Sequence, residues 1–398
     1  MVFKLFLQCC TLPNCHFPFS LLVHKKEGKG VKRQIFKIFL GLAACLFLSS
    51  CGFKDIDKRI FVQAIGIDHS DNEKEPYKVI LKIAVPSGAL KESGTKYAYI
   101  SKQGSSLSEA IRFLKSHTDK ELDFGHAKVI VLGDSVLEHS LHDVLDFFFR
   151  RRDIQMISWV AVGKPSAEKV LKVHPKTEMS GTFALSNFFS DNGVESPYIV
   201  SSFLFDARRR IVESGFDPIL PIIQTKGDKH KLMVNQSVVF SGVKNTKTLQ
   251  LSSMQTKYYN LLANNIDKMD IKVGKGQKEF TFSVDSAKVK YKIITSGKKP
   301  VLKMDILVGG IIEESKFDMS PKDLNKYSRR AAKHTKKEAL KLLTLFQDKD
   351  VDPLGFGLRY KATRLSNGKR IEEWKNLYPD LTFDVSVDAK IMSTGTIE

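Results

Sequence analysis

Cysteine is missing from this chain beyond residue 51. The 398 residues hold five cysteines, and all lie within the first 51 positions: Cys9, Cys10, Cys15, Cys45 and Cys51. The remaining 347 residues therefore contain no disulfide, and their folding rests on a hydrophobic core alone. The sequence also lacks a run of about 20 apolar residues, which a membrane-spanning helix would need.

The motifs of common enzyme sites are also lacking. We find no glycine-rich phosphate loop, no nucleophile elbow and no paired-cysteine metal site. His139 and His142 have the i, i+3 spacing of zinc ligands, but no cysteine or third ligand accompanies them. The sequence therefore predicts a protein that is not an enzyme, with no catalytic residue, cofactor or metal.

A short motif at residues 48–51 predicts export and lipid attachment. An 11-residue apolar run, residues 38–48, follows a basic cluster at 32–37 and ends at Leu48, Ser49, Ser50 and Cys51. A basic segment, a short apolar segment and small residues form a secretory signal. A cysteine directly after them is typical of a bacterial lipobox. We therefore expect residues 31–50 to be a signal peptide and Cys51 to carry diacylglycerol at the new N-terminus.

Residues 1–30 do not fit this signal. They hold three cysteines and a second apolar patch ahead of the basic segment. Lys26-Glu27-Gly28 can be encoded by a ribosome-binding sequence, and a GTG codon for Val31 could start translation. We expect residues 1–30 to be a mis-annotated leader and translation to begin at Val31.

The charge balance is strongly basic. The net charge is +19, and it falls to +13 beyond residue 50 because the first 50 residues hold seven Lys or Arg and one Glu. An exported chain rarely meets nucleic acid, so the anionic surface of the membrane is the better partner. An ordinary solvated basic surface is the alternative.

The first half alternates strand and helix patterns. Strands are expected at residues 61–68, 77–85, 128–132 and 154–162, the first two joined as a hairpin. Ser106 and Glu109 form a capping-box pattern before an amphipathic helix, and a second helix is expected near 136–149.

The second half has its own pattern. A strand is expected at 238–243, a helix at 249–262, and long alternating strands at 280–293 and 301–312 with a bulge near Asp285. Ser320 and Pro321 begin a long helix that runs to about residue 348, and a strand closes the chain at 381–391.

These patterns predict an α+β fold, with helices packed on mixed and antiparallel sheets. We place an N-terminal α/β domain at 51–215, a linker at 216–231 and a C-terminal α+β domain at 232–398. The linker is placed on Pro218, Pro221 and a Lys-Gly-Asp-Lys turn.

Three blocks of residues resemble the Ger(x)C family, the lipoprotein C subunits of nutrient germinant receptors in endospore-forming bacteria. The first runs from Asp57 to Asp68, the second from Gly125 to Lys164, and the third from Asp352 to Ile391. Two features depart from the family: Gly52-Phe53 follows the anchor, and the segment between Phe356 and Trp374 is longer than usual.

The resemblance implies a multi-domain α+β protein without cofactors, tethered on the outer face of the spore's inner membrane. It implies assembly with two integral membrane subunits, of A and B type, and a requirement in germination triggered by nutrients. A lipid-anchored solute-binding protein is the alternative, although it would need two similar lobes. A cell-wall hydrolase would need a catalytic set that the sequence lacks.

The third block contains a motif with two interpretations. Gly355 and Gly357 flank Phe356. They either present the ring to a partner or form a tight turn with the ring in the core. We favour the turn, because glycine supplies backbone freedom in both cases.

Overall fold

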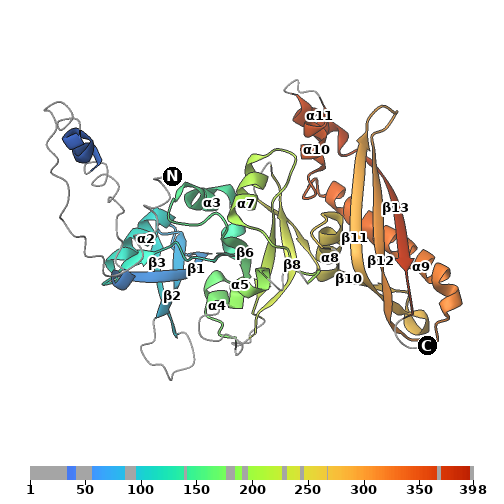
Figure 1. Ribbon diagram of the computed structural model, residues 1–398, viewed down its shortest axis with the longest axis horizontal. Coiled ribbons are helices and arrows are strands. Elements are labelled where there is room, and N and C mark those ends of the chain that lie inside the picture. Colours follow the sequence, from blue (N-terminus) through green and yellow to red (C-terminus); the bar gives the residue numbers. More distant parts are fainter. Residues whose placement is uncertain are drawn as a thin grey trace. The chain divides into compact units, whose positions relative to one another are not determined.

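The computed structural model describes residues 34–41, 56–85, 96–138, 141–175, 184–190, 196–225, 231–242, 246–266, 268–364 and 369–394 (Figure 1). The chain divides into two compact units, residues 1–57 and 58–398. In the first unit, residues 34–41 are helical. The expected leader, lipobox and anchor, residues 1–30 and 48–51, lie outside the described residues.

A mixed sheet of nine strands occupies the first part of the second unit, in the order β3-β2-β1-β5-β6-β7-β8-β9 with β4 beside β1. The strands are β1 (Arg59–His69), β2 (Tyr77–Val85), β3 (Lys96–Gly104), β4 (Glu121–Asp123), β5 (Val129–Gly133), β6 (Trp159–Lys164), β7 (Ile219–Gln224), β8 (Met233–Phe240) and β9 (Lys247–Leu251). β1, β5, β6 and β7 run parallel, and antiparallel strands extend the sheet on both sides.

Helices cover both faces of this sheet. The alternation of side chains along β5 sends Ile130 and Leu132 to one core and Val129 and Val131 to the other. The first core is shared with α2 (Leu107–Ser116), α3 (Leu141–Arg150) and α7 (Leu204–Val212), and the second with α4 (Ala167–Leu171) and α5 (Ala184–Phe189). Short 3₁₀ turns flank these elements at η1 (Ile56–Lys58) and η2 (Asp134–Glu138).

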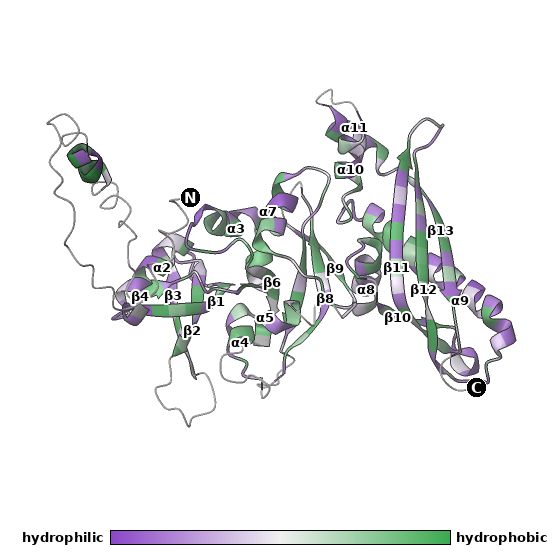
Figure 2. Ribbon diagram, viewed as in Figure 1, coloured by the Kyte–Doolittle hydropathy of each residue, from purple (hydrophilic) through white to green (hydrophobic). Residues whose placement is uncertain are grey.

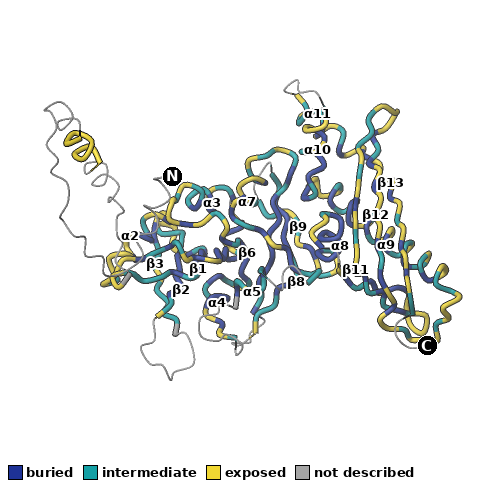
Figure 3. The backbone as a smooth tube through the Cα atoms, viewed as in Figure 1, coloured by how far each residue is buried: buried dark blue, intermediate teal, exposed yellow. Residues whose placement is uncertain are grey.

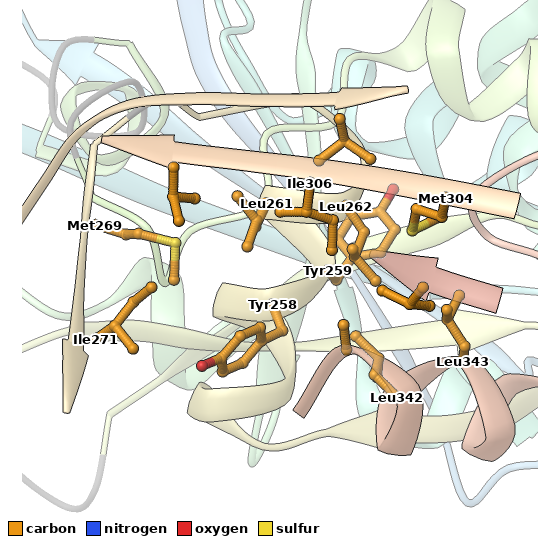
Figure 4. Close-up of a cluster of buried hydrophobic side chains, with 14 of the residues drawn as sticks. Tyr258, Tyr259, Leu261, Leu262, Met269, Ile271, Met304, Ile306, Leu342 and Leu343 are labelled. Atoms are coloured by element: carbon orange, nitrogen blue, oxygen red, sulfur yellow. The ribbon is translucent and has the colours of Figure 1, made fainter. Parts of the chain in front are cut away.

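A second mixed sheet, in the order β10-β11-β12-β13, follows in the sequence. Its strands are β10 (Met269–Val273), β11 (Phe280–Ile294), β12 (Val301–Ser315) and β13 (Thr382–Ile391). The hydrophobic and hydrophilic residues alternate along β11 and β12 (Figure 2). The apolar face packs on α8 (Ser253–Leu262) and α9 (Leu324–Asp348), and Figure 4 shows Tyr259, Ile306 and Leu342 meeting there. The remaining elements are η3 (Gly276–Lys278), η4 (Pro321–Asp323), α10 (Phe356–Ala362) and α11 (Arg370–Leu377).

Several local predictions are confirmed. The chain is α+β, β1 and β2 form the expected hairpin, and the Ser106 side chain caps α2 by accepting a hydrogen bond from the Glu109 N–H. The register of β11 against β12 shifts between Val284 and Ser286, where the bulge was expected. Ser320 accepts from the Lys322 N–H at the start of η4, which leads into α9.

Other predictions need correction. The expected strand at 154–162 begins only at Trp159, and the expected helix at 249–262 is a strand up to Leu251. The capping box of Ser252 and Gln255 starts α8 there, which turns Met254 outward. The second sheet is not antiparallel throughout, because the chain returns through α9 and sets β13 parallel to β12. Within the expected linker, residues 219–224 form β7, which pairs with β6 and β8.

One buried carboxylate positions a helix start against the first sheet. Asp68, at the end of β1, accepts hydrogen bonds from the N–H groups of Ala167 (2.7 Å) and Glu168 (2.9 Å) in the first turn of α4. A Cβ atom on Gly133 of the neighbouring strand would collide with this carboxylate. Asp68 and Gly133 therefore act together to dock α4.

We expect Asp68→Ala to destabilise the protein by about 2–3 kcal/mol, because one buried and one half-buried backbone N–H group lose their acceptor. Urea unfolding measures the loss. The control is Asp71→Ala, an exposed residue in the adjacent turn, which should change stability little. Equal effects of the two variants would contradict the assigned role of Asp68.

Candidate functional site

The glycine motif of the C-terminal block lies at the start of α10. Gly355 has a left-handed backbone, with φ of +73°, and is the residue before the helix. Phe356 is 1% exposed, and its ring meets that of Tyr291 edge to face, with centroids 5.0 Å apart. In this chain the motif is thus a turn with its aromatic ring in the core.

The two glycines allow a close approach between distant segments. A Cβ on Gly355 would lie 2.7 Å from the Phe216 ring, and one on Gly357 would lie 2.5 Å from the Trp374 ring. The N–H of Leu358 donates to the carbonyl of Gly215 (2.8 Å). The motif therefore packs closely against residues 215–217, the segment that leads into β7 of the first sheet.

Two aspartates complete this junction by bonding to each other's backbone. The N–H of Asp352 donates to the Asp217 carboxylate (2.6 Å), and the N–H of Asp217 donates to the Asp352 carbonyl (3.0 Å). The Asp352 carboxylate accepts from Phe356 (3.0 Å) and Gly357 (2.7 Å), so it also caps α10. Asp217 further accepts from the N–H of Gly242, after β8.

A buried arginine lies over the same junction. The Arg210 guanidinium, on α7, donates to the carbonyls of Asp217 and Pro353, both at 3.1 Å, and stacks on Phe216. It is held from its own helix by Asp206 (2.8 Å). One cation therefore satisfies backbone carbonyls from two distant segments, one before β7 and one before α10.

A cavity of about 500 Å³ opens beside these residues. Gly215, Asp217 and Ser241 line one side, and Asp352, Trp374 and Tyr378 are among the residues of the other. Burial raises the pKa of Asp352 to about 7, and the charge of Asp217 adds to this, against the backbone N–H groups of Gly357 and Phe356. Burial also raises the pKa of Asp217.

The chemistry of the site is that of a structural junction. Its carboxylates accept backbone N–H groups, and none of the contacts described forms a nucleophile and base pair. Among the described residues there is no group of three or more His, Cys, Asp or Glu that could hold a metal ion. His142 lies beside Asp143, whereas His139 is outside the described residues. No helix in the described ranges is long and apolar enough to span a membrane.

Two of these junction residues, Arg210 and Asp217, were not predicted from the sequence. Arg210 belongs to the Arg-Arg-Arg run at 208–210, in a stretch whose pattern indicated only a short helical segment and loops. Its spacing from Leu204 and Ala207 places it on the buried side of α7, and this is the signal that could have found it. Asp217 carries no comparable signal, because its partner is 135 residues away.

Comparisons with known proteins identify both halves of the chain. Residues 52–225 match the family model of the spore germination protein N-terminal domain, and residues 235–395 match that of the spore germination B3/GerAC-like C-terminal domain. The chain belongs to the Ger(x)C family of spore germination proteins.

Individual Ger(x)C proteins agree with this. The chain is 24% identical over 367 residues to the spore germination protein GerQC of Bacillus cereus, covering 90% of this chain and 99% of that one. It is 21% identical over 396 residues to the spore germination protein KC of Bacillus subtilis (strain 168), covering 91% and 96%. The crystal structure of the GerBC protein matches with a TM-score of 0.52 and 16% identity, over 83% and 97% of the chains, which supports the fold.

The glycines of this Ger(x)C junction provide a test with a matched control. We expect Gly355→Ala to cost about 2 kcal/mol more than Gly276→Ala in urea unfolding. Both positions have a positive φ, but a Cβ meets Phe216 at 2.7 Å in the first and nothing within 4 Å in the second. Similar losses in the two variants would mean that the close approach contributes nothing.

The buried carboxyl of Asp352 predicts a pH dependence. Its pKa lies above the unfolded value, so the folded state binds the proton more tightly. The resulting stabilisation is complete below about pH 4 and is lost as the pH rises through about 7, with a ceiling of about 4 kcal/mol. We expect the urea midpoint to fall between about pH 5 and 8, and this fall to shrink in Asp352→Asn.

Asp350→Asn is the control for this measurement. Asp350 is an exposed neighbour whose backbone has a positive φ, which asparagine tolerates as well as aspartate does. This variant should keep the pH dependence of the parent. A parent stability that is flat between these pH values would show that Asp352 does not titrate there.

Proposed function

We propose that this protein is a non-enzymatic, lipid-anchored subunit of a spore nutrient germinant receptor, which assembles with integral membrane subunits of A and B type. The observation that carries the proposal is the match of both halves to the two spore germination family models, over residues 52–225 and 235–395. The protein acts in germination through contacts with its partners, on the extracytoplasmic face of the spore inner membrane.

The junction supports a role through contacts rather than catalysis. The glycines and aspartates of the C-terminal block hold backbone segments together, and their hydrogen-bonding groups are engaged in doing so. Phe356 is in the core and is not offered to a partner. Partner recognition is thus left to the outer surface of the two sheets and their helices.

A lipid-anchored solute-binding protein is the alternative function. The cavity at the junction favours it, since a volume of about 500 Å³ suits a small nutrient. The two halves of the chain are not similar lobes, because one contains a sheet of nine strands and the other a sheet of four. Titration calorimetry with single nutrients separates the two, because the receptor subunit requires no nutrient binding by this chain alone.

The proposed anchor sits close to the folded part in the sequence. Seven residues separate Cys51 from β1. A tether of this length keeps the protein at the membrane and converts docking onto membrane subunits into an event at high effective concentration. Weak surface contacts are then sufficient for assembly.

We expect Cys51→Ala to release the protein from the spore membrane fraction and to slow nutrient germination. The reason is that the acyl chains are attached through this thiol. Membrane fractionation with immunoblotting and the loss of optical density of germinating spores measure the two effects. Deletion of the gene, with germination assayed on single nutrients, sets the full defect for comparison.

Two results would contradict the proposal in different ways. Unchanged membrane association of Cys51→Ala would remove the lipid anchor from the proposal. Normal germination of the deletion strain on each nutrient tested would remove the receptor function.

A further inference from the structure

The outer face of α9 carries a stripe of positive charge that the fold does not use. Its members are exposed cations on one side of the helix, here called the α9 stripe: Lys326, Arg329, Lys333, Lys336 and Lys337. At 1.5 Å per residue the stripe is about 16 Å long. Exposed and buried positions alternate along α9 (Figure 3). The stripe lies opposite the buried side of the helix, which includes Ala331, Thr335 and Leu342.

None of the five cations has an acidic partner within the part of the chain that the structure describes. Glu338, on the same helix, pairs with Lys341, and Glu279 nearby pairs with Lys272 and Lys316. The neighbouring Arg330 is different, because it donates to the Lys278 carbonyl and lies over the Phe280 ring. The free cations are therefore a distinct set.

Repulsion between the charges of the stripe lowers the stability of α9. Like charges at i, i+3 and i, i+4 repel each other, while glutamate at alternate positions would give stabilising pairs with a similar helix propensity. The charges also act on His334, whose pKa is lowered by burial and further by Lys341 and Lys337, against the charge of Glu338. Packing explains which residues stand on the inner face of α9, but it does not explain why the outer face carries lysine and arginine.

An open hollow at the start of the helix indicates which kind of ligand the charges could bind. It has a volume of about 440 Å³ and is lined by Lys322, Lys326, Arg329 and Lys333 among others. Its lining is rich in lysine and arginine side chains, and Asp323 is the acidic residue among them. Such a setting suits a phosphate group more than a neutral ligand.

We propose that the α9 stripe is a docking surface for the anionic headgroups of phospholipids. This inference rests on the proposed membrane attachment, which would keep the whole protein at a lipid surface. Charge complementarity and the long, mobile side chains suit a surface of mobile phosphates. No large apolar side chain on the outer face of α9 is exposed, so binding is electrostatic adsorption rather than insertion.

The test uses the mature chain from residue 51 with Cys51→Ser, so that no acyl chain contributes. Its partitioning to vesicles of phosphatidylglycerol mixed with phosphatidylcholine is measured by co-flotation and compared with pure phosphatidylcholine. We expect binding to the anionic vesicles only. We also expect it to be lost in about 1 M salt, where charges are screened beyond about 3 Å.

The stripe variant is Lys326→Gln, Lys333→Gln and Lys337→Gln together. We expect its partition coefficient to fall more than tenfold, and by about a hundredfold if each cation contributes about fivefold. The matched control is Lys288→Gln, Lys290→Gln and Lys292→Gln on β11, which removes the same charge from an exposed face opposite the core. The control should lose less than about threefold, since long-range charge alone remains affected.

A third variant guards against loss of folding. Replacing the same three stripe lysines by arginine keeps the charge and should retain binding. Urea unfolding of all variants should match the parent within the limits of surface substitutions.

Three outcomes would overturn the proposal. These are absence of binding to anionic vesicles, equal losses in the stripe and control variants, and stripe-dependent binding of poly-glutamate without vesicle binding. The last outcome would indicate that the stripe binds an acidic protein and not a lipid surface. Because these measurements omit the acyl chain, they are independent of the Cys51→Ala result in spores, and either can fail alone.

Discussion

The reciprocal bonding of Asp217 and Asp352 is the constraint on which the rest of this structure depends. Each residue donates its backbone N–H to the other, one to a carboxylate and one to a carbonyl, across 135 positions of sequence. Backbones can approach this closely only where side chains are absent, and Gly215, Gly355 and Gly357 supply that room. Arg210 then covers the carbonyls that remain. The segment before β7 and the segment before α10 are thus joined through main chain, which tolerates little sliding.

The same arrangement occurs at the other end of the first sheet. Asp68 holds the start of α4 as Asp352 holds the start of α10, by accepting two successive backbone N–H groups. In both places a glycine stands where a Cβ would collide. The residues that carry the family resemblance are thus largely residues of architecture. The crystal structure of the GerBC protein shares the fold at 16% identity.

The features that could be predicted from the sequence are those that depend on residues close together in the chain. The hairpin, the Ser106 cap and the bulge near Asp285 depend on neighbouring residues, and the period of the pattern reveals them. The position of β7 inside the sheet could not be predicted in this way, because a proline such as Pro221 argues against a central strand. In the structure β6 pairs with β7 only from Ile222 onward, so the missing N–H costs no ladder bond on that side. The direction of β13 and the contacts of Arg210 and Asp217 depend on chain segments far apart, and no local pattern encodes them.

An anchor at Cys51 and the α9 stripe would act on different degrees of freedom. Acyl chains hold a protein at the bilayer but leave it free to tumble about a short tether. A row of cations on one helix restricts that tumbling, because only one orientation brings all of them to the lipid surface. The cost of docking onto a membrane subunit is largely the loss of such freedom. Orientation by α9 would reduce that cost while leaving the opposite face of the second sheet, with Lys288, Lys290 and Lys292, away from the bilayer.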